Sequence, residues 1–226
     1  MEEFPQPTKN ALTVWKITGA ICSTIPGLST IRELSQHFLE SRIELYQGKL
    51  IEAVRREGIE VLSDEQAAFY VPAAYRFFEQ VRLGEYDHNL FVLAALIAGN
   101  LNNEMGRADV GRVGRAARKL ELLSLGELTA LVRCKEAFEI SGTLPDDDSN
   151  ELCFGPRLLV RIYGCHGQEI TYLAALESLH ELASRGLLTV GSNNKTMGGQ
   201  YFFRNRAFDE IIEAALTLTA RTQPAA

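Results

Sequence analysis

The sequence predicts a mainly α-helical protein, with an N-terminal helical bundle over residues 9–140 and a small α+β module over residues 155–222. Through most of the first part, apolar residues recur at three- to five-residue steps, which is the spacing of one helix face. After a polar segment at 141–154, which we interpret as a linker loop, short β-branched runs alternate with glycine-rich turns. The composition, 46% apolar and 23% charged in 226 residues, is typical of a globular chain with a sizeable core.

The bundle begins with a short helix followed by a long one. We expect residues 1–8, which are acidic and contain prolines, to form a flexible tail. A short helix is predicted over residues 11–23, and Pro26-Gly27 breaks the chain after it. A long helix follows over residues 28–57, where acidic and basic residues fill the gaps between the apolar positions and predict a solvated outer face.

Two serines open later helices of the bundle with capping-box signatures. Ser63 precedes Gln66 by three residues, and Ser124 precedes Glu127 by the same spacing. A proline within a helix removes a hydrogen bond and clashes with the preceding turn, so we expect a kink or a new start at Pro72.

Aspartates cap the two helices that lie between these serines. Asp87 begins an apolar helix that runs to Leu101, and Asp109 begins another that runs to Leu123. The bundle therefore alternates helices with short polar breaks.

The C-terminal module has a distinctive order of elements. Residues 158–163 form a strand or a short helix, and Thr171 caps a helix that Gly186 ends. A hairpin follows, with strands over 187–190 and 200–204 around a polar turn, before a closing helix over 208–218. Helix, strand, polar hairpin, strand and helix in this order predict a winged-helix-like module, with the hairpin as its wing.

Two segments are apolar enough to be considered as membrane spans, residues 11–31 and 90–101. A span needs about 20 mostly apolar residues, and neither segment qualifies. We interpret the unbroken apolar run Leu90–Ala98 as a helix buried in the bundle. The first segment leaves an alternative, an interfacial stripe that contacts a membrane surface. Its residues are Trp15, Ile17, Ile21 and Ile25.

No catalytic or metal-binding signature is found, so we expect no enzyme, no cofactor and no metal. The four histidines lack metal-ligand spacing, and there is no nucleophile elbow or P-loop. A zinc site in which Cys153 approaches Cys165-His166 is an alternative, but a buried structural cysteine is the commoner role. The four cysteines are too sparse for a disulfide scaffold, and no export signal is seen. These two features predict a cytoplasmic protein.

Two groups of basic residues are candidate contact sites, although 29 acidic against 23 basic residues exclude a chain-wide basic footprint. On one helix, Arg112, Arg115 and Lys119 share a stripe with Arg118 beside it, which predicts contact with phosphate or an acidic partner. A solvated face that balances the acidic helices is the simpler alternative. The predicted wing contributes a second group. Its members are Lys195, Arg204 and Arg206.

The order of motifs along the chain is similar to that in a known group of proteins. An Ile-Pro-Gly-Leu motif leads into the long charged helix, a Phe-Val-Leu-Ala-Ala-Leu-Ile-Ala-Gly-Asn segment follows, and a glycine-ended helix precedes the hairpin. Over residues 20–215 this order resembles uncharacterised bacterial helical proteins that include the abortive-infection alpha proteins. Many of these end with a tyrosine and a Leu-Thr-Pro turn, where this chain has Tyr-Phe-Phe-Arg-Asn at 201–205. The resemblance implies a setting in phage defence or on a mobile element, and supplies no catalytic residues.

The function predicted from these features is that of a non-enzymatic cytoplasmic interaction or regulatory protein. We expect a protein partner or a second copy of the chain. A DNA-binding transcription regulator is the first alternative, but Glu177 and Glu181 on the would-be recognition helix argue against it. A membrane-acting abortive-infection effector is the second alternative.

Overall fold

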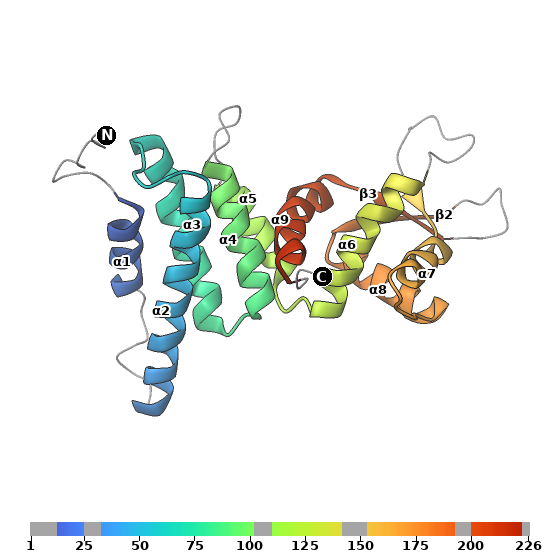
Figure 1. Cartoon of the computed structure of the whole chain (residues 1–226), viewed down its shortest axis with the longest axis horizontal. Helices are drawn as coiled ribbons and strands as arrows, with labels where there is room; N and C mark the ends of the chain where they lie inside the picture. Colours follow the sequence, from blue (N-terminus) through green and yellow to red (C-terminus); the bar gives the residue numbers. More distant parts are fainter. Residues whose placement is uncertain (1–12, 25–32, 102–109, 142–152, 193–199, 223–226) are drawn as a thin grey trace, which may run out of the picture. The chain divides into compact units, whose positions relative to one another are not determined.

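The computed structural model describes residues 13–24, 33–101, 110–141, 153–192 and 200–222. These residues are mainly helical and include one small antiparallel sheet, as predicted for the fold class. The chain divides into two compact units, Met1–Arg118 and Lys119–Ala226. Figure 1 colours the chain from blue at its N-terminus to red at its C-terminus.

Unit 1 is a helical bundle. Its helices are α1 (Val14–Thr24), α2 (Glu33–Arg56), α3 (Asp64–Leu83), α4 (Asp87–Leu101) and most of α5 (Val110–Leu120). The helices α1 to α4 pack on one another around an aromatic core (Figure 1). Tyr46 meets Phe77 edge-on at 6.2 Å between ring centroids, and Phe77 meets Phe78 at 5.2 Å. The strongly apolar α4 is buried along most of its length, as predicted.

Local sequence signals set the ends of α3. Ser63 and Gln66 form the predicted capping box, and Gly84 ends the helix with a φ of 83°, a conformation that glycine adopts without strain. The helix runs without interruption through Pro72, so a new start at that residue is wrong. Buried residues on both sides, including Tyr70 and Ala73, pack into the core and outweigh the hydrogen bond that proline removes.

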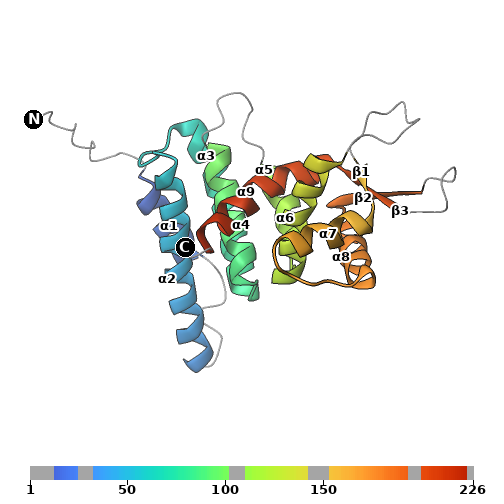
Figure 2. The same ribbon diagram turned by 45° about the vertical axis from the view of Figure 1, so that its right-hand side comes forward.

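Unit 2 combines helices with the sheet. Its helices are α6 (Leu125–Ile140), α7 (Pro156–Cys165), α8 (Tyr172–Ser184) and α9 (Arg206–Thr222). The strands are β1 (Cys153–Phe154), β2 (Leu188–Ser192) and β3 (Gln200–Arg204). They pair antiparallel in the order β1-β3-β2, with Leu188 opposite Arg204 and Cys153 opposite Phe203. Figure 2 shows the three strands side by side, with α7 and α8 adjoining them.

The helix α6 lies in unit 2, whereas the sequence analysis groups it with the bundle over 9–140. It packs against α7, α8, α9 and β1. The Phe138 ring lies 4.9 Å from the Phe154 ring and 5.3 Å from the Phe208 ring, both in edge-on geometry. Apolar periodicity identifies this helix but does not say which neighbours cover its buried face, so the boundary predicted at residue 140 rests on the polar linker alone.

Two details of unit 2 differ from, or resolve, the sequence predictions. The last two residues of the predicted linker 141–154 form the strand β1. The sequence does not predict this strand, because two residues are too few to show alternation. Residues 158–163, for which the sequence allows a strand or a short helix, belong to the helix α7, which begins with Pro156 at its first position. The predicted tail 1–8, the Asp109 cap and most of the linker lie outside the described residues.

Candidate interaction surfaces

The outer face of α8 is acidic and apolar. Ala175, Leu179 and Leu182 are buried in unit 2, and Thr171 caps the helix by accepting a hydrogen bond from the Ala174 amide. The opposite side is exposed, and we call its residues the α8 face. They are Leu173, Glu177, Glu181 and Ser184. Leu173 is 67% exposed, Oε1 of Glu181 lies 3.2 Å from Nε of Arg185, and Glu177 has no ion pair with any described residue. This face presents negative charge and apolar surface to solvent.

A shallow hollow lies beside the α8 face. It has a volume of about 320 Å³ and is lined by Arg157 and Val160 of α7 and by Tyr172 of α8. The Tyr172 ring is 46% exposed and precedes Leu173 in the chain. The hollow therefore offers an apolar wall with one guanidinium group, a combination found at the centres of protein interfaces.

The described residues of the predicted wing pair with carboxylates. Arg204 at the end of β3 forms an ion pair with Asp209, and the Nε of Arg206 lies 3.0 Å from Oε1 of Glu210. Lys195 lies outside the described residues. Because a neighbouring carboxylate offsets each guanidinium, Arg204 and Arg206 contribute little net positive charge to a contact with phosphate.

The structure separates the four basic residues predicted on α5. Arg115 and Arg118 are exposed and Arg112 is half-buried. Lys119 is turned towards the C-terminal end of α8, where its Nζ donates to the carbonyl oxygens of Arg185 at 3.1 Å and Gly186 at 2.7 Å. Lysine commonly satisfies the last carbonyls of a helix in this way. The spacing of charges along a helix does not reveal such a partner distant in sequence.

A cation that sequence reasoning missed lies next to this helix. The Arg76 guanidinium of α3 lies so close to Gly114 that a β-carbon at position 114 would overlap it. Arg118 is one helical turn beyond Gly114 and lies on the same side of α5. We call Arg76, Arg115 and Arg118 the basic cluster of unit 1. The signal in the sequence was Gly114 itself, since a glycine within a helix often marks a close approach.

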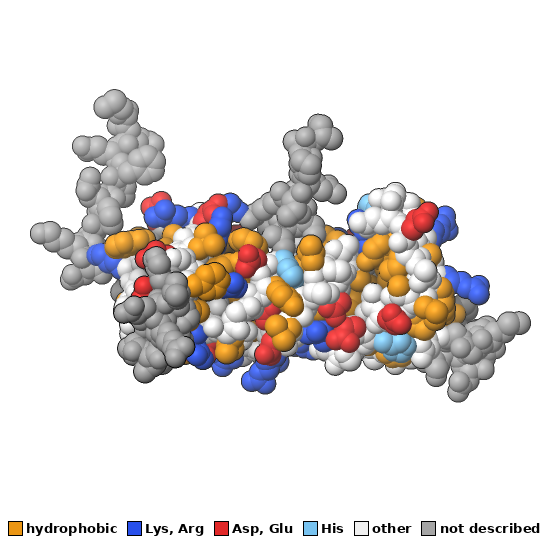
Figure 3. All heavy atoms as spheres, turned by 90° about the horizontal axis from the view of Figure 1, so that it is seen from below, with side chains coloured by type: hydrophobic (Ala, Val, Ile, Leu, Met, Phe, Trp, Pro, Cys, Tyr) orange, Lys and Arg blue, Asp and Glu red, His pale blue; other side chains and the backbone are white. Residues whose placement is uncertain are grey.

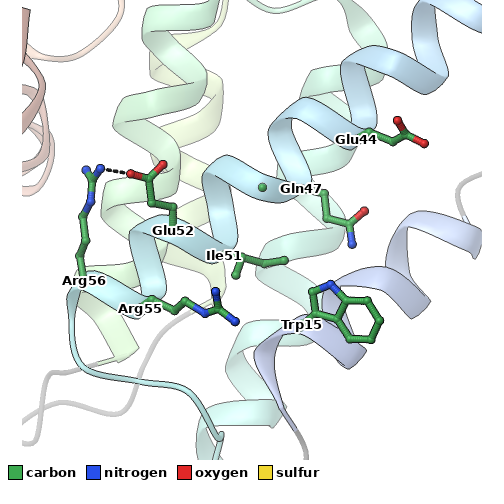
Figure 4. A pocket seen from close by; sticks show the side chains of 8 residues that line it. Trp15, Glu44, Gln47, Ile51, Glu52, Arg55 and Arg56 are labelled. Atoms are coloured by element: carbon green, nitrogen blue, oxygen red, sulfur yellow. Dashed lines mark hydrogen bonds and ion pairs between the residues drawn. The ribbon is translucent and has the colours of Figure 1, made fainter.

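A groove runs between α1 and α2 (Figure 4). It has a volume of about 580 Å³, and Trp15 of α1 forms one wall with an indole that is 62% exposed. The side chains of Gln47 and Arg55 extend from α2 towards this indole, and Ile51 lies at the base. The position of α1 is fixed by a buried hydrogen bond of 2.7 Å between the hydroxyls of Thr18 and Tyr70.

The same groove bears on the predicted interfacial stripe. Of its residues, Trp15 is exposed, Ile17 is half-buried and Ile21 is buried in unit 1, whereas Ile25 lies outside the described residues. The described part of the stripe is thus not an exposed apolar face. No helix in the described ranges is long and apolar enough to cross a membrane.

A polar cluster joins α6 to the end of α7. Oε2 of Glu136 lies 2.7 Å from Nε2 of His166, and its Oε1 accepts a hydrogen bond of 2.6 Å from Arg133. Burial raises the pKa of the Glu136 carboxyl, but the hydrogen bonds from His166 and Arg133 lower it by more, so the pKa lies below its ordinary value. The cluster holds a charged carboxylate between two helices and thereby stabilises their contact.

The cysteines do not gather with histidine in the described part of the chain. Cys153 is buried in β1, whereas Cys165 is exposed at the end of α7. Cys134 is buried in α6, and burial raises the pKa of its thiol. Among the residues that the structure describes, no group of three histidine, cysteine, aspartate or glutamate side chains could hold a metal ion.

Charged side chains of both signs intermingle on the surface. On the face drawn in Figure 3, basic and acidic groups alternate among the described residues without forming a continuous basic band.

Comparison with known proteins finds no relative: no family model, no curated protein and no solved structure matches the chain.

Proposed function

We propose that the protein is a non-enzymatic interaction protein in which unit 2 is a winged-helix-like module that binds a protein partner. Support for the winged-helix comparison comes from the element order α6-β1-α7-α8-β2-β3 and from the sheet order β1-β3-β2. In this arrangement α8 takes the place of the recognition helix, and the hairpin β2-β3 takes the place of the wing.

The observation that carries the proposal is the acidic and apolar character of the α8 face. A DNA-reading helix enters the major groove between two rows of phosphates and normally carries basic and amide side chains. Here Glu177, which has no ion pair with a described residue, would face those phosphates at a cost, and Glu181, whose charge Arg185 offsets, would add no attraction. Leu173 and the adjoining hollow would remain unused. A protein partner that covers Leu173 and Tyr172 removes apolar surface from water and gains free energy.

The cellular setting is part of the same proposal. A cytoplasmic location is supported by the four cysteines, none of which forms a disulfide among the described residues. A role in phage defence or on a mobile element is supported by the resemblance described for the sequence.

Photocrosslinking from the α8 face tests the proposal directly. A benzophenone amino acid would replace Leu173 in the full chain, expressed in a bacterial host, and the matched control would carry it at Leu83, an exposed leucine of unit 1. We expect a discrete adduct from position 173 that proteases remove and nucleases leave intact. An adduct removed by nuclease, or the same adducts from both positions, would contradict it.

DNA binding remains the alternative, and the basic cluster of unit 1 is the observation that favours it. Arg76 and Arg118 are exposed and have no ion pair with a described residue. Fluorescence anisotropy with mixed-sequence duplexes at two salt concentrations separates the two functions, because phosphate contacts make affinity fall steeply with salt. Tight, salt-sensitive binding that the variant R115E/R118E abolishes would support DNA binding over binding of a protein partner.

A further inference from the structure

Two charged residues of α2, Glu44 and Arg55, lack a partner among the residues that the structure describes. Ion pairs with described residues engage most of the basic side chains of α2 and also Glu52. These residues are Arg42, Lys49, Glu52 and Arg56. Glu44 and Arg55 are exposed, and neither has a hydrogen bond or ion pair with any described residue. Both line the groove beside Trp15 (Figure 4).

The spacing of these two residues places them on one strip of the helix. They are eleven residues apart in the sequence, which corresponds to about three turns and about 16.5 Å along the axis. Gly48 lies between them on the same strip, and a β-carbon placed there would meet nothing within 4 Å. The middle of the strip is therefore open to the close approach of another backbone.

We propose that this strip is an interface between two copies of the chain, in which the α2 helices lie antiparallel and Glu44 of each copy faces Arg55 of the other. A twofold axis makes such a contact reciprocal, since each copy supplies the same surface. With Glu44 opposite Arg55, the register places Gly48 of one copy opposite Ile51 of the other. The smallest residue then meets the apolar base of the groove.

Charge complementarity selects a second copy as the occupant. A partner helix in this groove needs a cation opposite Glu44 and a carboxylate three turns away opposite Arg55. The chain itself carries this pair at the required spacing and in the reversed order. The exposed Trp15 indole adds apolar area to the contact at the edge of the groove. This interface lies in unit 1 and is independent of the partner proposed for unit 2.

Charge reversal in the full-length protein tests the interface. We expect the wild-type protein to form a dimer in sedimentation equilibrium. Each of the variants E44R and R55E places like charges together at two symmetric points, and we expect each to weaken self-association by about tenfold or more. The variant E44R/R55E restores both pairs in the reverse sense and should dimerise like the wild type.

Mixing the single variants gives the sharpest measurement. In a pair of one E44R chain and one R55E chain, arginine faces glutamate at both points, so the mixture should form a one-to-one heterodimer although neither variant dimerises alone. Misfolding of either variant would not produce this rescue. The control E169R changes the net charge by the same amount as E44R at an exposed residue of unit 2, and should leave the dimer intact.

Three results would overturn the proposal. They are a wild-type protein that stays monomeric at the highest measurable concentration, a dimer that E44R and R55E do not weaken, and single variants that fail to associate with each other when mixed. A monomeric wild-type protein would mean that a second copy does not occupy the groove. A dimer that the variants do not weaken would mean that self-association uses another surface.

Discussion

Lys119, the first residue of unit 2, contacts the end of α8, and this contact defines its role. Its ammonium group satisfies two carbonyl oxygens that have no partner within the helix. We expect Lys119→Met to lower the free energy of unfolding by about 1 kcal/mol, the value of a net hydrogen bond. The matched variant Arg118→Met, at an exposed neighbour, should change it by less than about 0.5 kcal/mol. Urea unfolding followed by circular dichroism measures both, and equal effects would contradict the assignment.

The pKa of Glu136 makes a prediction about pH. Because hydrogen bonds lower this pKa in the folded protein, the carboxylate contributes stability above its unfolded pKa, and the contribution is lost as pH falls through the folded pKa. We expect Glu136→Gln to cost about 1 kcal/mol at neutral pH. The difference from wild type should shrink as the pH falls from about 5 to about 3. A difference that stays constant over this range would show that the charge of Glu136 is not involved.

At the residue scale, the sequence predicts which charged side chains are exposed better than it predicts their interaction partners. Periodicity identified Arg115 and Arg118 as exposed cations, but it grouped them with Lys119, whose partners are carbonyls 66 and 67 residues away. It also missed Arg76, because the contact with Gly114 depends on how α3 lies against α5. For the groove residues Glu44 and Arg55 the sequence predicts only a solvated face, since it does not show which charges are paired.

Among the elements, the β2-β3 hairpin depends on one glycine. Gly191 lies opposite Tyr201, and a β-carbon at this position would collide with the Phe203 ring. We expect Gly191→Ala to destabilise the protein by about 1 kcal/mol through overpacking. In a Phe203→Ala background the same substitution should cost nothing, because the ring is gone. A double-mutant cycle measures this coupling, and a zero coupling energy would contradict the contact.

Elements with strong local signals were predicted well, and those without were not. Capping boxes at Ser63 and Ser124 and the Thr171 cap are confirmed, because each signal acts within one turn. The two strands of the hairpin are also confirmed, because the residues that predict each strand are neighbours in the chain. The strand β1 escaped detection because its two residues owe their conformation to pairing with Phe202 and Phe203, far along the chain.

At the scale of the whole molecule, the boundary between the units follows from packing. The sequence places it at the polar linker after residue 140, whereas the compact units divide between Arg118 and Lys119. The difference concerns α6, whose buried face includes Phe138 and Leu131. A linker marks where a chain is polar, but a unit is defined by which apolar faces cover one another, and that information is not local.

Truncation distinguishes the two boundaries. We expect a fragment of residues 119–226 to unfold cooperatively, because it retains the Phe138, Phe154 and Phe208 cluster and the Lys119 contacts at α8. A fragment of residues 141–226 lacks α6 and exposes Phe154 and Phe208. Removing one buried phenylalanine already costs about 3–5 kcal/mol, which is a large part of the stability of a small domain. The shorter fragment should therefore show no cooperative transition in thermal unfolding followed by circular dichroism. If both fragments unfold at the same midpoint, α6 is not part of the core of unit 2.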